Sequence, residues 1–326
     1  MSVENPTIAE IGEAEALRRT VSRLNQSEFA VVGSGDDCAV VSTTDERFVV
    51  TTDTMIEGHD FRLDWSSAYD LGWKAVASNL ADVAAMGARP TALVVALAVP
   101  STTRVNWLEQ FADGLREACQ QLAPGVGVVG GDLAAADTVF IAVTAHGQLE
   151  GREPVLRSGA KPGDVLAVAG TLGRAACGLA LLQSGEATAI SAYDDWVNTQ
   201  RRPNPPIAAG AEAARAGASS MLDLSDGLAK DAHRVAKASG VTMQIDRRAL
   251  DGYLAMLEEP AMRIQANPLL WVLAGGEDHS LLATFSPNAT IPRSFKPIGR
   301  VLEQGSNLVL LDDTPLEDAG WDSFTV

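Results

Sequence analysis

The amino-acid sequence predicts an α/β protein built from two domains. The chain has 326 residues, which is long for a single hydrophobic core, so two domains of ordinary size are expected. Apolar residues at helical spacing alternate along the chain with short runs of β-branched residues, a pattern typical of mixed helices and strands. A polar stretch containing several glycines and prolines occupies residues 151–164, and such stretches commonly link domains. We therefore expect one domain over residues 1–150 and a second over residues 151–326.

The composition is that of a strongly acidic globular protein. Hydrophobic residues make up 46% of the chain and charged residues 21%, which excludes an intrinsically disordered chain. The 42 acidic residues outnumber the 25 basic ones and give a formal charge of −17. This charge argues against a nucleic-acid partner, whose phosphates require a basic surface. A phosphorylated substrate remains compatible with it if metal ions lie between the protein and the phosphate.

The cysteines and histidines indicate neither disulfides nor zinc. Cys38, Cys119 and Cys177 lie far apart and form no C-x-x-C pair, and the four histidines lack the spacing of metal ligands. The first residues are acidic and have no apolar segment of the kind found in signal peptides. The longest apolar run, Ala92 to Pro100, is too short to span a bilayer. We expect a protein of the reducing cytoplasm without a membrane partner.

In the first half, the clearest helix is predicted over residues 68–86. Its apolar residues recur on one face, and Gly87 followed by Pro90 marks its end. Strands are predicted over Cys38–Val41 and Phe48–Thr52, joined as a hairpin by a polar turn. That hairpin would bring Asp36 and Asp37 close to Asp53. The other expected elements of this half are helices over 7–24 and 105–122 and strands over 92–99 and 137–145.

The second half alternates helices and strands. A helix over residues 227–238 follows a short strand over 219–222, and Ser225 or Asp226 is expected to cap it. Gly275 and Gly276 predict a tight turn before a strand over 279–285. The other expected elements are helices over 174–183 and 206–216 and strands over 165–169, 241–245, 298–302 and 308–311.

Carboxylates recur where an apolar run meets a turn or a helix boundary. Six such sites occur, at Asp36–Asp37, Asp53, Asp82, Asp132, Asp223–Asp226 and Glu277–Asp278. Any one of them is explained by capping or by a turn. Together, without a matching set of basic residues, they suggest a shared hard cation. Mg²⁺ prefers oxygen ligands and usually accompanies a phosphate, so a magnesium-phosphate site is the interpretation.

A glycine motif suggests a different protein class. Residues 125–130 match G-x-G-x-x-G, and Glu150 lies twenty residues beyond Gly130, as in dinucleotide-binding proteins. That motif should follow a strand and open a helix, whereas here a helix precedes it and a strand follows it. No G-x-x-x-x-G-K-[ST] occurs, which excludes an ordinary P-loop. A nicotinamide oxidoreductase and a non-catalytic acidic metal-binding protein remain as alternatives.

The chain resembles the thiamine-monophosphate kinases of the aminoimidazole-ribonucleotide-synthetase-like superfamily. Seven motifs carry the resemblance in the same order: GSGDDCAVV at 33–41, TTDT at 51–54, NLADVAAMGA at 79–88, GGD at 130–132, RSGAKPGD at 157–164, DLSDGL at 223–228 and GGED at 275–278. The resemblance implies transfer of the γ-phosphoryl group of ATP onto thiamine monophosphate. It also implies an N-terminal α/β domain whose sheet joins its twin in a homodimer, and a C-terminal α/β domain that closes the active site. Relatives in the superfamily make aminoimidazole ribonucleotide, selenophosphate or a hydrogenase-maturation thiocarboxylate derivative.

The resemblance further implies roles for individual residues. Mg²⁺ ligands would be Asp37, Thr51, Thr52, Asp53, Asp82, Asp132, Asp223 and Asp226. ATP would contact Gly131, Asp132, Arg157 and Ser225, and the residues most directly involved in catalysis would be Asp53, Asp132 and Arg157. Glu277 and Trp321 would hold the thiamine end. Where the family has a histidine before Phe61, this chain has Asp60 and carries His59 one position earlier. The expected substrate contact is therefore Asp60, with His59 as the alternative.

The reaction fits the residue types in the chain. Joining two phosphates brings several negative charges together, and the attacking phosphate oxygen is already ionised at neutral pH. No general base is then required, in keeping with the lack of an evident catalytic histidine. Charge neutralisation by Mg²⁺ and an arginine, together with positioning, would be the main catalytic terms. We expect a direct in-line transfer without a phosphorylated enzyme intermediate.

Overall fold

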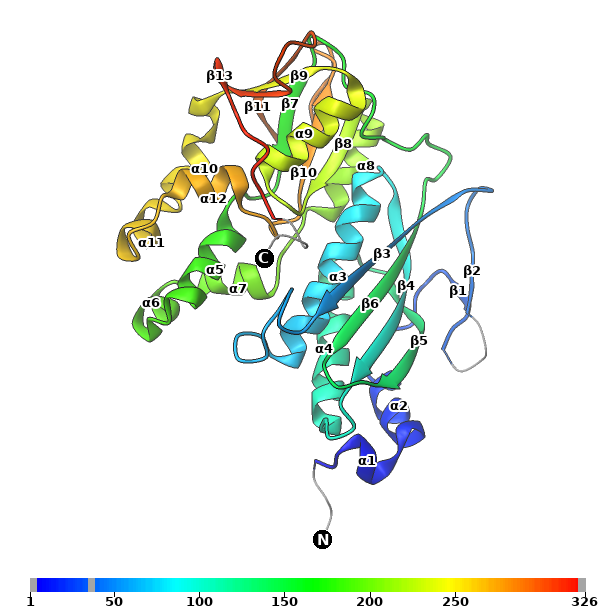
Figure 1. Cartoon of the computed structure of the whole chain (residues 1–326). Coiled ribbons are helices and arrows are strands. Elements are labelled where there is room, and N and C mark those ends of the chain that lie inside the picture. The colour runs from blue at the N-terminus through cyan, green and yellow to red at the C-terminus, as the bar shows by residue number, and fades with distance from the viewer. Residues whose placement is uncertain (1–4, 35–38, 322–326) are drawn as a thin grey trace. The chain divides into compact units, whose positions relative to one another are not determined.

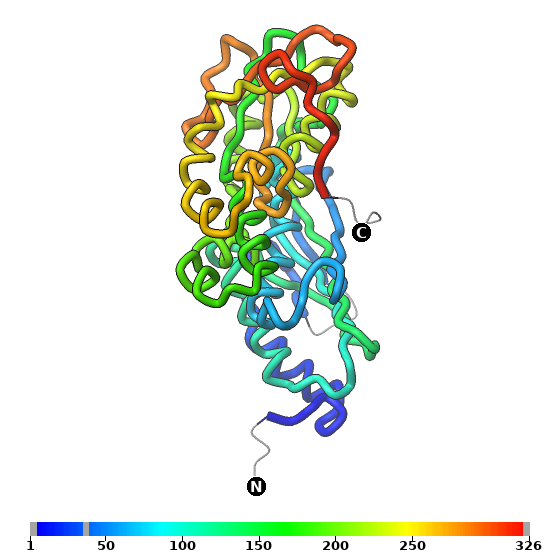
Figure 2. The backbone as a smooth tube through the Cα atoms, turned by 60° about the vertical axis from the view of Figure 1, so that its left-hand side comes forward, coloured from blue at the N-terminus to red at the C-terminus, as the bar shows by residue number. Residues whose placement is uncertain are grey.

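The computed structural model describes residues 5–34 and 39–321, and it confirms the α/β architecture (Figure 1). The chain divides into two compact units, whose backbones can be followed in Figure 2. None of the helices in the described ranges is long and apolar enough to cross a lipid bilayer. Unit 1 comprises Met1–Val83 and Arg89–Gly151, and unit 2 comprises Ala84–Ala88 and Arg152–Val326.

The described part of unit 1 contains a four-stranded sheet in the order β3-β6-β4-β5. β6 pairs antiparallel with both β3 and β4, while β4 and β5 are parallel and are connected through helix α4. The strands are β3 (Phe48–Ile56), β4 (Arg89–Val99), β5 (Gly127–Ala135) and β6 (Phe140–Gln148), and the long helices are α3 (Ala68–Ala85) and α4 (Val105–Leu122). Both long helices were predicted within one or two residues.

Helices cover one face of this sheet, and the other face is open among the described residues of unit 1. On the covered face, a Cβ at Gly147 of β6 would lie 2.3 Å from the side chain of Val83 in α3. On the open face, Phe48 and Val50 are each 58% exposed, and Thr52 and Thr54 are exposed beside them. Because side chains alternate along a strand, the residues between them point toward the helices.

α3 and α4 cross at unusually close range. A Cβ at Gly72 would lie 2.2 Å from the carbonyl oxygen of Phe111, and a Cβ at Gly114 would lie 2.1 Å from that of Tyr69. Two glycines therefore allow the two helix backbones to touch where a side chain on either one would push them apart.

The N-terminal segment differs from the prediction. Instead of one helix over 7–24, it forms α1 (Ile8–Ile11) and α2 (Glu13–Val21), separated at Gly12, whose φ is 79°. The predicted hairpin is wrong, because β2 (Val40–Val41) pairs with β1 (Ala30–Val32) and not with β3. β3 instead pairs with β6 along nine residues, a far more extensive ladder than a two-residue strand could offer. Asp36, Asp37 and Cys38 lie outside the described residues.

The described part of unit 2 is built on a seven-stranded sheet in the order β13-β12-β9-β11-β7-β10-β8. Its neighbouring strands are antiparallel except for β9 and β12. Helix α9 (Leu228–Ser239) packs on β8, β9 and β12. The strands are β7 (Val165–Ala169), β8 (Ala218–Leu224), β9 (Thr242–Ile245), β10 (Ser280–Phe285), β11 (Phe295–Leu302), β12 (Val309–Leu311) and β13 (Thr314–Pro315).

The remaining helices of unit 2 include several that the sequence pattern did not predict. α5 (Arg174–Ser184) and α8 (Ile207–Arg215) match the prediction. The unpredicted ones span four to eight residues, too few for a helical period to stand out. They are α6 (Ala187–Ala192), α7 (Asp194–Arg201), the 3₁₀ helix η1 (Arg247–Leu250), α10 (Asp251–Ala255), α11 (Glu258–Arg263) and α12 (Pro268–Ala274).

The close helix crossing yields a stability prediction. Gly72→Ala places a methyl group 2.2 Å from the Phe111 carbonyl oxygen, so it should lower the free energy of unfolding by about 1–3 kcal/mol, as overpacking does, although alanine favours helices. The matched control is Gly252→Ala in α10, where a Cβ meets nothing within 4 Å and stability should stay constant or rise slightly. Urea denaturation of both variants measures the difference. Equal midpoints would contradict the crossing described above.

Candidate active site

Thr51 and Asp82 form a polar contact between β3 and α3. The Thr51 hydroxyl donates to Oδ2 of Asp82 over 2.8 Å. Asp82 is half-buried, while its neighbours Ala81 and Val83 are buried. Asp53 lies two residues beyond Thr51 on β3, so its side chain points to the same face of the sheet. The structure therefore places three of the predicted metal ligands on the helix-covered side of the sheet in unit 1, two of them in direct contact.

Thr52 lies on the opposite, open face of the sheet. Its hydroxyl donates to the carbonyl oxygen of Val143 over 3.0 Å and accepts from the hydroxyl of Thr144 over 3.2 Å. This predicted metal ligand is thus separated from Thr51 and Asp53 by the sheet itself.

Gly131 and Asp132 lie within β5, not at the end of a strand as the sequence suggested. A β-bulge between Leu93 and Val94 shifts the pairing of β4 with β5, and a Cβ at Gly131 would lie 2.1 Å from the carbonyl oxygen of Val95. Any side chain at position 131 would collide with the backbone of β4, so this position requires glycine. As expected from the sequence, a helix (α4) precedes the glycine motif and a strand (β6) follows β5, which is not the context of a dinucleotide-binding fingerprint.

Asp132 and Asp53 are far apart within one chain. β3 and β5 are the two edges of the sheet, so three strand spacings, about 14 Å, separate them. Asp53 pairs with Val143, which pairs with Val95, which pairs with Gly131. Asp132, the next residue, is therefore on the other face of the sheet. A single unit 1 does not place both carboxylates at one site.

An apolar pocket lies against Gly130–Asp132, and the sequence analysis missed it. Its volume is about 440 Å³. The walls come from α2, α4 and the neighbouring strands, and they include Leu17, Val21, Leu24, Leu108, Phe111 and Leu115. The apolar faces of the two helices were visible in the sequence, but their convergence on the glycines of β5 was not.

In unit 2, three distant segments converge at the end of β8. Asp223, the penultimate residue of β8, is 3% exposed. The Glu277 N–H donates to the Ser225 carbonyl oxygen over 2.9 Å, and the Trp321 N–H donates to that of Asp226 over 3.0 Å. The packing is close, since a Cβ at Gly276 or at Gly320 would lie 2.3 Å from one of these two oxygens. The structure thus gathers five of the predicted site residues.

Asp226 forms an ion pair, and another carboxylate orders the start of α9. Nη2 of Arg234 lies 2.5 Å from Oδ2 of Asp226, and Nη1 lies 2.6 Å from Oδ1 of Asp231. Asp231, which is 0% exposed, also accepts the N–H groups of Asp226 and Gly227. The prediction that Ser225 or Asp226 caps this helix is wrong, because Gly227 occupies the N-cap without a side-chain bond and Asp231 reaches back from the first turn. Burial, and then the negative charge of Asp223, raises the pKa of Asp231 to about 7.

The Glu277–Asp278–His279 segment adopts a strained backbone conformation. Glu277 and His279 have φ values of 71° and 49°, in a region that residues other than glycine rarely adopt. Asp278 between them is buried and accepts the Thr171 hydroxyl over 2.6 Å and the Ala175 N–H at the start of α5 over 3.4 Å. Its burial raises its pKa. Asp278 therefore anchors the segment that carries Glu277, and Nδ1 of His279 lies 3.4 Å from Oδ2 of Asp223.

Arg157 and Asp60 take no part in the hydrogen bonds described above for the segments at the end of β8. Arg157 is exposed beside β8, where the Leu156 carbonyl oxygen accepts the Met221 N–H over 3.1 Å. Asp60 closes the turn after β3 by accepting the Ile56 N–H over 2.7 Å, and His59 is exposed beside it. Asp37 lies outside the described residues.

The donors suit magnesium but form separate groups. All are carboxylate or hydroxyl oxygens, the ligands that Mg²⁺ prefers. Over residues 5–34 and 39–321, no three side chains of aspartate, glutamate, histidine or cysteine lie close enough together to hold a metal ion. The groups are Thr51, Asp53 and Asp82 in unit 1, Asp132 on the far edge of the same sheet, and Asp223 and Asp226 in unit 2.

Comparison with known proteins identifies relatives along the whole chain. Residues 35–149 match the family AIR synthase related protein, N-terminal domain, and residues 161–309 match AIR synthase related protein, C-terminal domain. A thiamine-monophosphate kinase of Mycobacterium tuberculosis is 42% identical over 99% of this chain and 95% of its own length. One from Corynebacterium glutamicum is 37% identical over 98% of this chain and 96% of its own length.

Solved structures show the same fold. A thiamine monophosphate kinase from Aquifex aeolicus matches with a TM-score of 0.75 and 32% identity over 83% of this chain and 89% of that chain. A structure described as AaThiL complexed with AMPPCP and TMP matches with a TM-score of 0.77 and 29% identity over 96% of each chain. The hydrogenase maturation protein HypE, at 18% identity and a TM-score of 0.68 over 88% of each chain, shares the fold.

The anchoring role of Asp278 can be tested by substitution. Asp278→Ala removes the acceptor for the part-buried Thr171 hydroxyl and for the buried Ala175 N–H. It should reduce the free energy of unfolding by about 1–3 kcal/mol, as expected when a buried donor is left unsatisfied. Asp278→Asn keeps one acceptor oxygen and should therefore lower the free energy of unfolding by less than the alanine variant does. Urea unfolding measures both variants. Similar stability of the alanine variant and the unmodified protein would refute the anchoring role.

Proposed function

The chain belongs to the AIR synthase-related family and, within it, to the thiamine-monophosphate kinases, and we propose that it transfers the γ-phosphoryl group of ATP to thiamine monophosphate, giving thiamine diphosphate and ADP. The observation that carries this function is the convergence of Asp223, Ser225, Asp226, Glu277 and Trp321, which come from three distant segments, at the end of β8. A cytoplasmic location belongs to the same proposal.

Two groups of oxygen ligands would hold magnesium. Thr51, Asp53 and Asp82 form the first, in unit 1, and Asp223 and Asp226 form the second, in unit 2. Bound Mg²⁺ would supply charge neutralisation between the two phosphates. Because Arg234 neutralises Asp226 in this structure, the Asp226 carboxylate must be shared with or released by Arg234 when it binds a cation. Asp231 keeps the Asp226 backbone in place during that exchange, since it accepts the Asp226 N–H.

ATP would be held through its base and its phosphates. The apolar pocket beside Gly130–Asp132 has a volume of about 440 Å³, ample for an adenine ring, and its leucine and phenylalanine walls suit a flat aromatic base. Gly131 and Asp132 line the same pocket. Arg157 and Ser225 would contact the phosphates, and an exposed arginine beside β8 provides the planar donors that phosphate prefers. No side chain has to act as a base, because the attacking phosphate oxygen is already ionised.

Glu277 and Trp321 would hold the thiamine end. The Trp321 side chain is 43% exposed, while its backbone is fixed to Asp226. An accessible indole suits a cationic aromatic substrate, since its face attracts positive charge, and Glu277 would supply a carboxylate. Asp60 remains the expected further contact at the end of β3, although it closes the local turn.

A homodimer with shared active sites completes the proposal. The open face of the unit 1 sheet carries Phe48 and Val50, each 58% exposed, and a second copy of the same face would bury them. Asp132 lies on this face, whereas Asp53 lies on the other face at the opposite edge. Because about 14 Å and the sheet itself separate Asp53 from Asp132 within one chain, a site that uses both carboxylates would draw them from two different copies of the chain.

The first test of the function is direct. Incubation with Mg-ATP and thiamine monophosphate, followed by chromatography, should give stoichiometric thiamine diphosphate and ADP, with no phosphorylated protein during turnover. Formation of ADP without thiamine diphosphate would show that the phosphoryl acceptor is a different compound, such as a substrate of another member of the superfamily. Absence of ADP would reject the kinase function, and a trapped phosphoenzyme would reject direct transfer.

The shared site can be tested by mixing variants. Asp53→Ala and Asp132→Ala should each leave the protein folded and remove turnover. After the two inactive variants are unfolded together and refolded, turnover should return to about a quarter of that of the unmodified protein, because half of randomly formed dimers are mixed and each mixed dimer has one intact site. Each variant refolded alone is the control. If turnover does not return in the mixture, the two carboxylates belong to the same chain. Normal turnover in either single variant would refute the role of that carboxylate in the reaction.

A further inference from the structure

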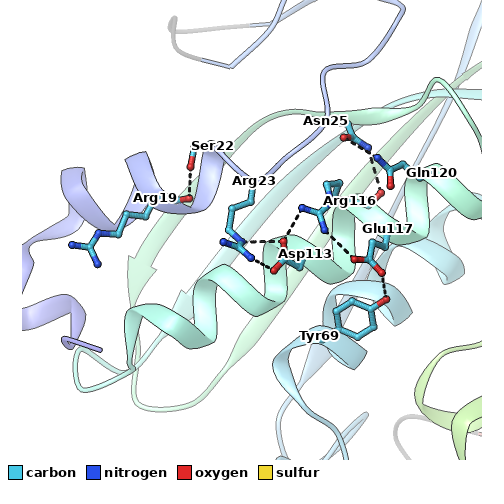
Figure 3. Close-up of polar contacts among 9 residues, drawn as sticks. All are labelled: Arg19, Ser22, Arg23, Asn25, Tyr69, Asp113, Arg116, Glu117 and Gln120. Carbon is cyan, nitrogen blue, oxygen red and sulfur yellow. Dashed lines mark hydrogen bonds and ion pairs between the residues drawn. The ribbon is translucent and has the colours of Figure 1, made fainter. Parts of the chain in front are cut away.

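A network of ion pairs connects the segment after α2 to α4 (Figure 3). Nε of Arg23 donates to Oδ1 of Asp113 over 2.9 Å, and Nη2 of Arg23 contacts Oδ2 of the same carboxylate. This two-point geometry fixes direction as well as distance, which a single contact does not. Asp113 is 17% exposed and Arg23 39%, and the carboxylate raises the pKa of the Arg23 guanidinium.

The rest of the network fixes Asp113 on its helix. Nη1 of Arg116 lies 2.9 Å from Oδ1 of Asp113, and its Nη2 lies 2.9 Å from Oε1 of Glu117. Oε2 of Glu117 accepts the Tyr69 hydroxyl over 2.6 Å, which ties this part of α4 to α3. Asp113 is therefore held between two arginines on a helix that is itself anchored.

The Arg23–Asp113 pair, hereafter the clasp, lies next to the apolar pocket in both of its elements. Arg23 falls between Val21 and Leu24, which line the α2 side of the pocket. Asp113 falls between Phe111 and Leu115, which line the α4 side. The clasp thus joins the two walls of the pocket without contributing to its lining. By contrast, Glu15 pairs with Arg18 and Arg19 within α2 itself.

We propose that the clasp is a positioning device that sets the spacing of α2 and α4 and thereby fits the pocket to the base of a purine nucleoside triphosphate. The inference rests on the proposed function, since it takes ATP as the ligand of the pocket. A flat aromatic base gains affinity from close van der Waals contact on both of its faces. If α2 and α4 were free to move apart, the pocket would lose contact with one face of the base. The phosphates would contact residues outside these two walls, so their binding should not depend on the spacing of α2 and α4.

The test separates the base from the phosphates. Arg23→Ala should raise KM for ATP and the inhibition constant of ADP about three- to five-fold, the range expected for a partly exposed ion pair. The KM for thiamine monophosphate and the inhibition constant of inorganic tripolyphosphate, which has no base, should stay unchanged. Asp113→Ala should behave like Arg23→Ala, and the double variant should be no worse than either single one. Arg23→Lys should recover part of the loss.

The matched control is Arg19→Ala. It removes the same charge from α2, just before the segment that carries Arg23, together with an ion pair to Glu15 that does not leave α2, and it should leave every constant unchanged. Equal effects on ADP and tripolyphosphate, unchanged ADP affinity in Arg23→Ala, or additive single variants would overturn the proposal. If the unmodified protein does not phosphorylate thiamine monophosphate but binds ADP in calorimetry, the proposed function fails, while the same comparison of ADP affinities still decides on the clasp. A protein that binds no ADP would overturn both.

Discussion

The pairing of β3 with β6 along nine residues is the constraint on which the arrangement of unit 1 depends. A slip of one residue would turn Thr51 and Asp53 to the open face and Thr52 toward the helices. The Thr51–Asp82 bond would then be lost, and polar groups would be buried under α3. The ladder therefore decides which oxygens of the TTDT motif face the helices and which face outward. Neither assignment was available from the motif itself.

The sequence predicted the long elements well and the local pairings poorly. The helix over 68–86 was clear because its apolar face and its Gly87 ending agree, and α3 ends at Ala85, one residue before the predicted end. The hairpin failed because strands 38–41 and 48–52 are neighbours in sequence, while the partner of β3 lies about ninety residues away. The cap of α9 failed because Asp231, which lies inside the helix, supplies the bonds that Ser225 or Asp226 was expected to make.

For the candidate site, too, the residue types could be predicted from the sequence but their arrangement in space could not. Carboxylates at the ends of apolar runs pointed to cation chemistry, and the structure gathers the residues around Asp223 and those around Thr51 as separate groups. The motifs carried no information on which side of a sheet each carboxylate lies, so the separation of Asp53 from Asp132 could not be foreseen. Nor could the apolar pocket, which arises only when α2 and α4 meet over Gly130–Asp132. Side-chain direction depends on register, and register depends on distant residues.

The glycine crossing of α3 and α4 has a mechanical consequence. With Gly72 against the Phe111 carbonyl and Gly114 against that of Tyr69, the two helices meet through backbone at their crossing, without side chains there to repack. Side-chain layers are what allow packed helices to slide past one another in small steps. We therefore expect the two helices to move together as one piece. The wall of the apolar pocket that contains Phe111 and the carboxylate of Asp82 belong to that piece, so a displacement of either one is transmitted to the other through backbone.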